Sequence, residues 1–369
     1  MISMKGKLSL TALLSILLLI AGCSAQNISK TPDAGKNVKN IILFIGDGMG
    51  TAHVYAAMTT AEKPLILESF PYTGFSKTYS SDNYVTDSGA GGTAIACGVK
   101  TRNGMIGVGP DSAAVTSITE IAYKNGLATG VVSTSSVTHA TPASFVAHNA
   151  GRGNYEDIAK DFLRGTVDVF IGGGEDHFRK RGDKDDLTVK LKQQGYDVVY
   201  NLDDLKKSES RKLAGLLAPG QMTKAADGRE GMLPQMVKKA IETLSRDKDG
   251  FFMMVEGSMI DWGAHEKSLD YTVEEMIDLD EAVRVAWEFA EKDGQTLIVV
   301  TADHETGGLT LVDGSITERK VVPQFIESGS HTGVMVPVFS YGPDAERFSG
   351  IHDNTFYLNE FVDILNLKK

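Results

Sequence analysis

Short apolar runs alternate with longer amphipathic stretches along most of this chain, and the alternation constrains the fold more than any other feature. The apolar runs are rich in Ile, Val and Phe and contain almost no polar residues. Such strands are typical of a sheet that is buried on both faces. Their alternation with helical stretches predicts an α/β fold, a three-layer α/β/α sandwich around a mainly parallel sheet. Strands are expected at residues 41–45, 128–132, 167–171, 251–255, 296–301 and 336–341, and helices at 115–124, 155–163, 232–244 and 273–291.

The first residues are predicted to be a targeting segment that does not belong to the fold. Lys5 and Lys7 precede an apolar run at 8–20. This run is shorter than the ~20 apolar residues that a membrane-spanning helix needs. Residues 1–22 therefore fit a secretory signal peptide. The ending Ala-Gly-Cys23 also resembles a bacterial lipobox, in which the cysteine is lipidated.

A lipidated Cys23 predicts a lipid-anchored protein of the bacterial cell envelope. Residues 23–37 are polar and fit a tether. Residues 38–369 contain no Pro/Gly/Ser-rich linker and are expected to form one domain. Ser24, directly after the cysteine, favours a periplasm-facing anchor. Cys97 is then the one remaining cysteine, so no intramolecular disulfide is expected.

The charge balance of the chain is acidic. There are 37 Lys and Arg residues against 48 Asp and Glu residues, for a formal net charge of -11. A nucleic-acid-binding protein normally shows a basic face, so this balance argues against nucleic acid as a partner. It does not exclude phosphate-bearing ligands, because bound cations can reverse the local field of a site.

Acidic residues stand at the ends of three of the predicted strands. Asp47 follows the first strand, Glu256 follows the fourth, and Asp303 and His304 follow the fifth. In open α/β sheets, ligands bind outside the carboxyl ends of the strands. A polar loop after a single strand is common and predicts little. All of these residues together predict one shared site.

Five segments contain residue types suited to chemistry. Glycines on both sides of Asp47 leave its carboxylate free for a cation. Ser88 opens the stretch Ser-Gly-Ala-Gly-Gly, which fits the start of a helix whose free N–H groups favour an anion. A flexible turn with an N-capping serine is the alternative. Asp261 and His265 are four residues apart and share one face of a helix, which suits zinc and also an ordinary surface pair.

The remaining two segments add histidines. Asp303 and His304 are adjacent, and neighbours can share a metal only where a strand has ended, since strand neighbours point to opposite faces. His331 stands in Ser-His-Thr-Gly, just before the last apolar run. A single histidine in a loop predicts nothing alone.

Together these segments resemble alkaline phosphatases, in the same order along the chain, from about residue 38 to residue 341. The Thr-Asp-Ser-Gly-Ala segment around Ser88, the Asp-x-x-x-His spacing, the Asp-His pair and the final His-Thr-Gly are all present. A sixth segment, His139-Ala-Thr-Pro-Ala, is also present, with Arg152 ten residues beyond its proline. The resemblance implies an alkaline-phosphatase-like fold. It also implies a phosphomonoester hydrolase that passes through a phosphoserine and releases inorganic phosphate and an alcohol.

The resemblance implies a role for each matching residue. Ser88 would be the nucleophile, and Arg152 would hold two oxygens of the phosphate, so both would bind the substrate. Two zinc ions and one magnesium ion would be the cofactors. Their ligands would be Asp47, Asp303 and His304 for the first zinc, Asp261, His265 and His331 for the second, and Asp47, Thr141 and Glu256 for the third ion.

Two departures leave parts of this scheme open. His139 and Trp262 stand where other members of the family have Asp and Lys. Magnesium is expected as the third ion, but an imidazole leaves room for zinc or cobalt. The connection from His304 to His331 is short, which predicts a compact form without a large accessory insertion. Such insertions contribute dimer contacts in larger members, so a homodimer is left open.

Alternative functions make different demands on this sequence. A sulfatase would need a Cys/Ser-x-Pro-x-Arg run, whereas Gly-Ala-Gly-Gly follows Ser88. Phosphodiesterases lack an equivalent of Arg152, and the related mutases carry a further inserted domain. A lipid-anchored phosphate- or metal-binding protein without turnover would not need Ser88. An interaction module whose glycines are only turns would bind no zinc.

Overall fold

The computed structural model describes residues 37–369. The predicted signal peptide at 1–22, the lipidated Cys23 and all but the last residue of the predicted tether lie outside the described residues. Within residues 37–369, no helix combines the length and apolar character that crossing a membrane requires.

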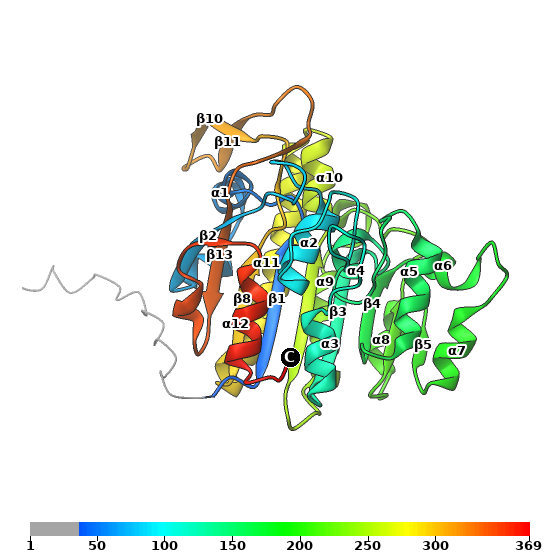
Figure 1. Ribbon diagram of the computed structural model, residues 1–369. Coiled ribbons are helices and arrows are strands. Elements are labelled where there is room, and N and C mark those ends of the chain that lie inside the picture. Colours follow the sequence, from blue (N-terminus) through cyan, green and yellow to red (C-terminus); the bar gives the residue numbers. More distant parts are fainter. Residues whose placement is uncertain (1–36) are drawn as a thin grey trace, which may run out of the picture. The chain divides into compact units, whose positions relative to one another are not determined.

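A ten-stranded sheet forms the centre of the described chain (Figure 1). In the order in which they lie in the sheet, its strands are β14 (Gly350–Asp353), β2 (Tyr72–Lys77), β13 (Val336–Tyr341), β8 (Thr296–Thr301), β1 (Asn40–Gly46), β7 (Phe251–Gly257), β3 (Ala128–Ser136), β4 (Val169–Gly173), β6 (Leu213–Leu216) and β5 (Asp197–Val199). Strand β13 is antiparallel to both of its neighbours, and all other pairs are parallel.

Strand β1 lies in the middle of this sheet, which explains why residues 41–45 are uniformly apolar. It pairs in parallel with β7 on one side and β8 on the other. Ile41, Leu43 and Ile45 belong to the core under one face of the sheet. Ile42 and Phe44 belong to the core under the other face. Because successive side chains of a strand point to opposite faces, burial on both faces demands an apolar residue at every position.

Helices cover both faces of the sheet, and the predicted three-layer α/β/α sandwich is confirmed. One face is covered by α2 (Ser88–Cys97), α3 (Ile118–Lys124), α4 (Ala140–Ala143), α5 (Tyr155–Asp161), α6 (Glu175–Arg179), α7 (Leu187–Gln193) and α12 (Phe356–Ile364). The other face is covered by α1 (Thr51–Thr60), α8 (Leu202–Lys207), α9 (Met232–Leu244), α10 (Met259–His265) and α11 (Leu269–Asp293).

The predicted helices are present, and capping residues set their ends. Helix α9 has the predicted bounds, whereas α3 begins three residues later than predicted. Its cap explains the difference, because the Ser117 hydroxyl accepts from the Glu120 N–H while the Glu120 carboxylate accepts from the Ser117 N–H. Helix α11 is longer than predicted, since Ser268 caps its start and Gly294, with φ of 67°, ends it.

The direction of β13 differs from the predicted parallel pattern for a topological reason. A parallel strand needs a crossover connection, usually a helix. The connection between His304 and His331 instead holds β9 (Glu305–Thr306), the hairpin of β10 (Thr310–Ser315) and β11 (Lys320–Gln324), and β12 (His331–Thr332). The chain therefore returns from the carboxyl edge of the sheet and runs antiparallel. Strands β2, β5, β6 and β14 were not predicted, because they are short or partly exposed.

Replacing Leu43 by alanine tests the central position of β1. The Leu43 side chain is fully buried, so Leu43→Ala should lower the free energy of unfolding by about 2–5 kcal/mol through lost burial and a cavity. Val312 in β10 is 53% exposed, so Val312→Ala should change it by less than about 0.5 kcal/mol. Urea unfolding followed by circular dichroism measures both values. Equal losses in the two variants would contradict the central position of β1.

Candidate active site

The carboxyl ends of four adjacent strands, β8, β1, β7 and β3, bring the predicted site residues to one edge of the sheet. These strands are far apart in sequence, and the sheet order alone makes them neighbours. Each contributes polar residues at or just beyond its end. The contributed residues are all buried, and they are Asp303 and His304 after β8, Asp47 after β1, Glu256 near the end of β7, and His139 and Thr141 after β3.

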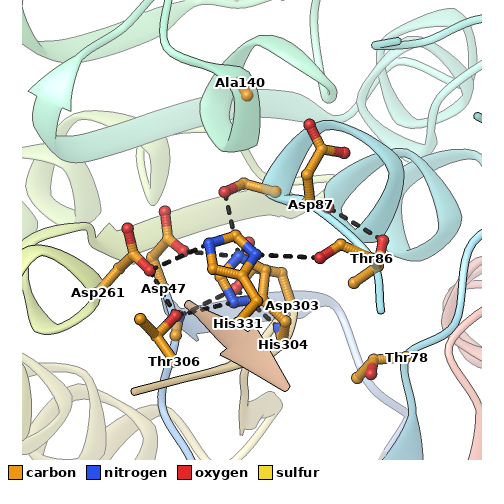
Figure 2. Close-up of polar contacts among 12 residues, drawn as sticks. Asp47, Thr78, Thr86, Asp87, Ala140, Asp261, Asp303, His304, Thr306 and His331 are labelled. Carbon is orange, nitrogen blue, oxygen red and sulfur yellow. Dashed lines mark hydrogen bonds and ion pairs between the residues drawn. The ribbon is translucent and has the colours of Figure 1, made fainter. Parts of the chain in front are cut away.

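Asp47, Asp303 and His304 form a first group of donors (Figure 2). Ser88 lies against this group. The Ser88 Oγ is 3.2 Å from His304 Nε2. The same nitrogen is 3.3 Å from Asp47 Oδ1 and 3.4 Å from Asp303 Oδ2. Two carboxylates and one imidazole at such distances can share one divalent cation.

A second group of donors consists of Asp261, His265 and His331. His265 Nε2 is 3.3 Å from Asp261 Oδ1 and 3.2 Å from His331 Nε2. Asp261 Oδ1 is 3.6 Å from His331 Nε2. Donors bound to a tetrahedral zinc ion at about 2.0–2.1 Å lie about 3.3 Å from one another. The spacing of these three atoms therefore fits a tetrahedral ion.

The two groups are in direct contact. The imidazole rings of His304 and His331 stack with centroids 3.6 Å apart. Donor atoms of Asp261, His304 and His331 also lie within 4.8 Å of one another. The Thr306 hydroxyl joins the groups as well, because it donates to Asp261 Oδ1 at 2.5 Å and lies 3.2 Å from His304 Nδ1. Two cations bound here would be close neighbours.

Backbone carbonyls orient two of the imidazoles. His265 Nδ1 lies 2.7 Å from the Gly329 carbonyl, and His331 Nδ1 lies 3.0 Å from the Thr86 carbonyl. A hydrogen bond to a carbonyl places the proton on Nδ1 and leaves the lone pair on Nε2. Both Nε2 atoms face the donor group, so both rings are set up as ligands.

A third group of donors consists of Asp47, His139 and Glu256, with ligand atoms within 4.8 Å of one another. Glu256 is held by a serine of β3 and by a serine between β7 and α10. Its Oε2 accepts hydrogen bonds from Ser133 and Ser258 at 2.5 and 2.6 Å. Its Oε1 has no hydrogen-bond partner among the described residues and is free to bind a cation.

Buried atoms without partners test whether cations fit this edge. An unpaired buried polar atom costs free energy, so each one needs an explanation. A bound cation satisfies an oxygen or nitrogen lone pair directly. Within residues 37–369, the atoms at this edge that are buried without a hydrogen-bond partner are Asp47 Oδ1 and Oδ2, Asp303 Oδ2, Glu256 Oε1, Thr141 Oγ1 and His139 Nδ1.

The electrostatics of the edge also favour bound cations. Burial and the charge of Asp303 raise the pKa of Asp47 well above its usual range. Burial and the charge of Asp261 raise the pKa of Asp303 to about 6. Burial lowers the pKa of His139 to about 3 and that of His304 well below its usual value. The charged form of these carboxylates is thus unfavourable without bound cations. The imidazoles, in contrast, are in the neutral form that binds metal.

Asp87 holds Arg152 at the rim of this edge. Arg152 Nη1 donates to Asp87 Oδ2 at 2.8 Å, and its backbone N–H donates to the Gly104 carbonyl. The Asp87 Oδ1 also caps helix α2 by accepting from the Ala90 N–H at 2.9 Å. One carboxylate therefore fixes the helix that begins with Ser88 and the guanidinium beside it.

Two glycines allow the close approach of these segments. A Cβ atom on Gly91 would lie 2.8 Å from the Asp303 carbonyl oxygen. A Cβ atom on Gly48 would lie 2.9 Å from the Asp261 Cα, and Gly48 has a φ of 73°. Any side chain at either position would push helix α2 or the loop after β1 away from the donors.

Several residues that hold the donors in place were not predicted from the sequence. Asp87, Ser258 and Thr306 lie within the predicted site segments, so their polar side chains could have indicated a role. Ser133 and Ser135 follow the predicted strand at 128–132, and hydroxyls at the carboxyl end of a strand were a weaker signal. Both hydroxyls donate to Glu256 Oε2.

This site combines buried cation ligands with a serine hydroxyl and a guanidinium. Such a combination is typical of metal-dependent enzymes that transfer phosphoryl groups. The model of the alkaline phosphatase family matches residues 38–322 of this chain. The chain therefore belongs to the alkaline phosphatase family. It is a phosphomonoester hydrolase that uses divalent metal ions.

Individual relatives agree with this membership. The chain is 34% identical to Alkaline phosphatase 4 of Bacillus subtilis, in an alignment that covers all of this chain and 98% of that protein. It is 40% identical to the alkaline phosphatase of the Antarctic bacterium TAB5, with a TM-score of 0.85, covering 90% of this chain and 99% of that chain. A mutant of the TAB5 enzyme with Mg bound in its M3 site matches equally well.

The comparison also bears on size. The alignment with the Bacillus subtilis protein extends over 455 residues, whereas this chain has 369. The relative therefore contains segments that this chain lacks.

Removing one carboxylate tests the electrostatic account of the site. Because folding raises the pKa of Asp303 from 3.8 to about 6, metal-free protein should lose stability as pH rises through this window. At pH 8, metal-free Asp303→Asn should therefore be more stable than metal-free wild type, by about 1–3 kcal/mol. The Asn oxygen can still accept from the Gly48 and His304 N–H groups, which now bond to Asp303 Oδ1.

Thermal unfolding at pH 8 and pH 4 after chelation, with and without added zinc, measures these effects. The advantage of the variant should shrink at pH 4, where Asp303 is protonated, and reverse with zinc, because the variant has lost a ligand. A metal-free variant less stable than wild type at pH 8 would show that repulsion is not the dominant effect.

Proposed function

We propose that this alkaline phosphatase acts through a phosphoserine at Ser88 and uses two zinc ions and one magnesium ion. The position of Ser88 carries the proposal. Its Oγ lies 3.2 Å from His304 Nε2, within the first group of donors. It is also the first residue of the ten-residue helix α2, whose free N–H groups favour the charge of a phosphate.

The chemistry of the donors supports this choice of ions. Mixed carboxylate and imidazole donors at tetrahedral spacing suit zinc. Oxygen donors suit magnesium, and Asp47, Thr141 and Glu256 supply only oxygen. His139 adds an imidazole to the third group, so zinc or cobalt stays an alternative there. The proposed ligands are Asp47, Asp303 and His304 for one zinc, Asp261, His265 and His331 for the other, and Asp47, Thr141, Glu256 and His139 for the third ion.

Ser88 makes and breaks the covalent bonds in the proposed reaction. Its hydroxyl gives up its proton as Oγ attacks the phosphorus, the bond from phosphorus to the ester oxygen breaks, and the leaving alkoxide takes up a proton and departs as the alcohol. Water then attacks the phosphoserine, the bond from Oγ to phosphorus breaks, and inorganic phosphate is released with the hydroxyl restored. When bound, zinc supplies Lewis-acid stabilisation of the charge on the attacking and leaving oxygens and lowers the pKa of water.

Arg152 is proposed to position the phosphoryl group. Its guanidinium has N–H groups in a planar fork that can donate two parallel hydrogen bonds to phosphate oxygens. Asp87 holds one of its nitrogens and stops the long side chain from turning to solvent. A phosphomonoester has three free oxygens, so Arg152 can hold two of them while the third faces the group of cation ligands. A diester has only two free oxygens, so this clamp favours monoesters.

We also propose a lipid anchor at Cys23, with the enzyme facing the periplasm of a bacterial envelope. The basic residues Lys5 and Lys7, the apolar run at 8–20 and the Ala-Gly-Cys ending support it. An enzyme held there would act on phosphomonoesters outside the cytoplasm.

Replacing Ser88 by alanine tests the phosphoserine. Ser88→Ala should lower kcat for a chromogenic phosphomonoester by about a thousandfold or more, because it removes the nucleophile. Bound zinc, measured by elemental analysis, should be unchanged, since Ser88 is not among the proposed ligands. Wild type stripped with a chelator should lose turnover and regain it with zinc and magnesium. A variant that keeps wild-type turnover would exclude Ser88 as the nucleophile.

Replacing Arg152 by alanine tests the clamp. Arg152→Ala should lower kcat/KM for a phosphomonoester by about 100- to 1000-fold, as expected for a lost charge-assisted donor pair. Turnover of a matched phosphodiester, which cannot use the clamp fully, should fall by about tenfold. The ratio of monoester to diester rates measures the effect. An unchanged ratio would show that Arg152 does not select monoesters.

A further inference from the structure

A hollow of about 570 Å³ lies at the amino edge of the sheet, the edge opposite the active site. Its lining comes from the end of α3, the end of α9 and the segments that lead into β3, β4 and β6. Four cations and two carboxylates border it. They are Lys124, Arg211, Lys212 and Arg246, with Asp168 and Asp247.

The four cations of this hollow lack carboxylate partners. Within residues 37–369, none of them forms an ion pair. The two nearby carboxylates accept hydrogen bonds from backbone N–H groups, Asp168 from Thr129 and Asp247 from Asp249. Burial raises the pKa of Asp168 and the charge of Lys212 lowers it in part, although the two residues form no ion pair. Four like charges around one hollow repel one another, and an anion would relieve that repulsion.

The chain enters the fold beside this hollow. The Asn37 carbonyl accepts from the Gln295 side chain, and the Lys39 N–H donates to the Gln295 carbonyl, just before β8 begins. Lys39 also packs against Gly250, where a Cβ atom would lie 2.1 Å from the Lys39 carbonyl oxygen. Gly250 is in the same connection as Arg246, between α9 and β7. In Figure 1, the start of β1 and the C-terminus lie at this same edge.

The length of chain before Asn37 ties this edge to the proposed anchor. Asn37 is the fourteenth residue after Cys23. Fourteen residues can span at most about 50 Å. If Cys23 carries lipid, as proposed above, Asn37 at the amino edge lies within about 50 Å of the bilayer. The carboxyl edge with the active site lies at the other end of the strands.

We propose that the amino edge of the sheet docks on anionic phospholipid, with headgroup phosphates bound in the cationic hollow. The rest of this acidic protein is repelled by an anionic bilayer, whereas unpaired cations are attracted to it. Each Lys or Arg held close to the membrane surface strengthens membrane binding by about fivefold. Docking in this orientation turns the active site away from the bilayer and leaves it open to soluble substrates.

Vesicle co-sedimentation of the metal-loaded mature chain, residues 23–369 with Cys23→Ser, tests the proposal without the lipid and without the apolar run at 8–20. Binding to vesicles of phosphatidylglycerol and phosphatidylcholine should exceed binding to phosphatidylcholine alone and weaken as salt increases. Arg211→Ala with Lys212→Ala should lower the partition coefficient by about 25-fold. The control Lys180→Ala with Lys320→Ala makes the same charge change at exposed, ion-paired positions and should lower it by less than about twofold.

Several results would overturn the proposal. Equal binding to neutral and anionic vesicles would do so, as would equal losses in the Arg211/Lys212 variant and the control. Stabilisation by millimolar inorganic phosphate that depends on Arg211 and Lys212, without vesicle binding, would assign the hollow to free phosphate instead. Both variants should hydrolyse a small phosphomonoester at the wild-type rate. Mass spectrometry of wild-type Cys23 tests the anchor separately, so failure of one proposal does not imply failure of the other.

Discussion

Repulsion among buried carboxylates at the carboxyl edge is the interaction on which the rest of this structure depends. Asp47, Asp303 and Glu256 have no exposed surface, and burial together with the charges of Asp303 and Glu256 raises the pKa of Asp47. A folded protein tolerates such a cluster of buried charges only where cations neutralise it. The parallel sheet makes the cluster unavoidable, because it aligns the carboxyl ends of strands whose sequences end in acidic residues. Metal binding and folding are therefore linked in this enzyme.

His304 and Asp87 make the separate parts of the site one unit. His304 contacts Ser88, Asp47 and Asp303 and stacks on His331, so a shift of this ring would disturb both groups of donors. Asp87 caps helix α2 and also holds Arg152, so it fixes the serine relative to the guanidinium. A reaction with an in-line geometry needs such shared contacts, because small displacements of the reacting groups lower the rate strongly.

The central strands and the donor residues could both be predicted from the sequence, because both follow from local patterns. Strand β1 is apolar because it is buried on both faces, and Asp47 follows it between glycines. The direction of β13 could not be read locally, since it depends on what the chain does between His304 and His331. The link from Asp87 to Arg152 joins residues 65 positions apart, and no spacing rule predicts it.

The two edges of the sheet carry opposite local charge, and this separation follows from the topology. All strands except β13 run in one direction, so loops that leave strands gather at one edge and segments that enter strands gather at the other. The first edge contains the buried carboxylates, and the second contains Lys124, Arg211, Lys212 and Arg246. Without bound metal, an anionic surface would repel the first edge and attract the second. Because the chain also enters at the second edge, the anchor proposed at Cys23 and the electrostatic field would favour the same orientation.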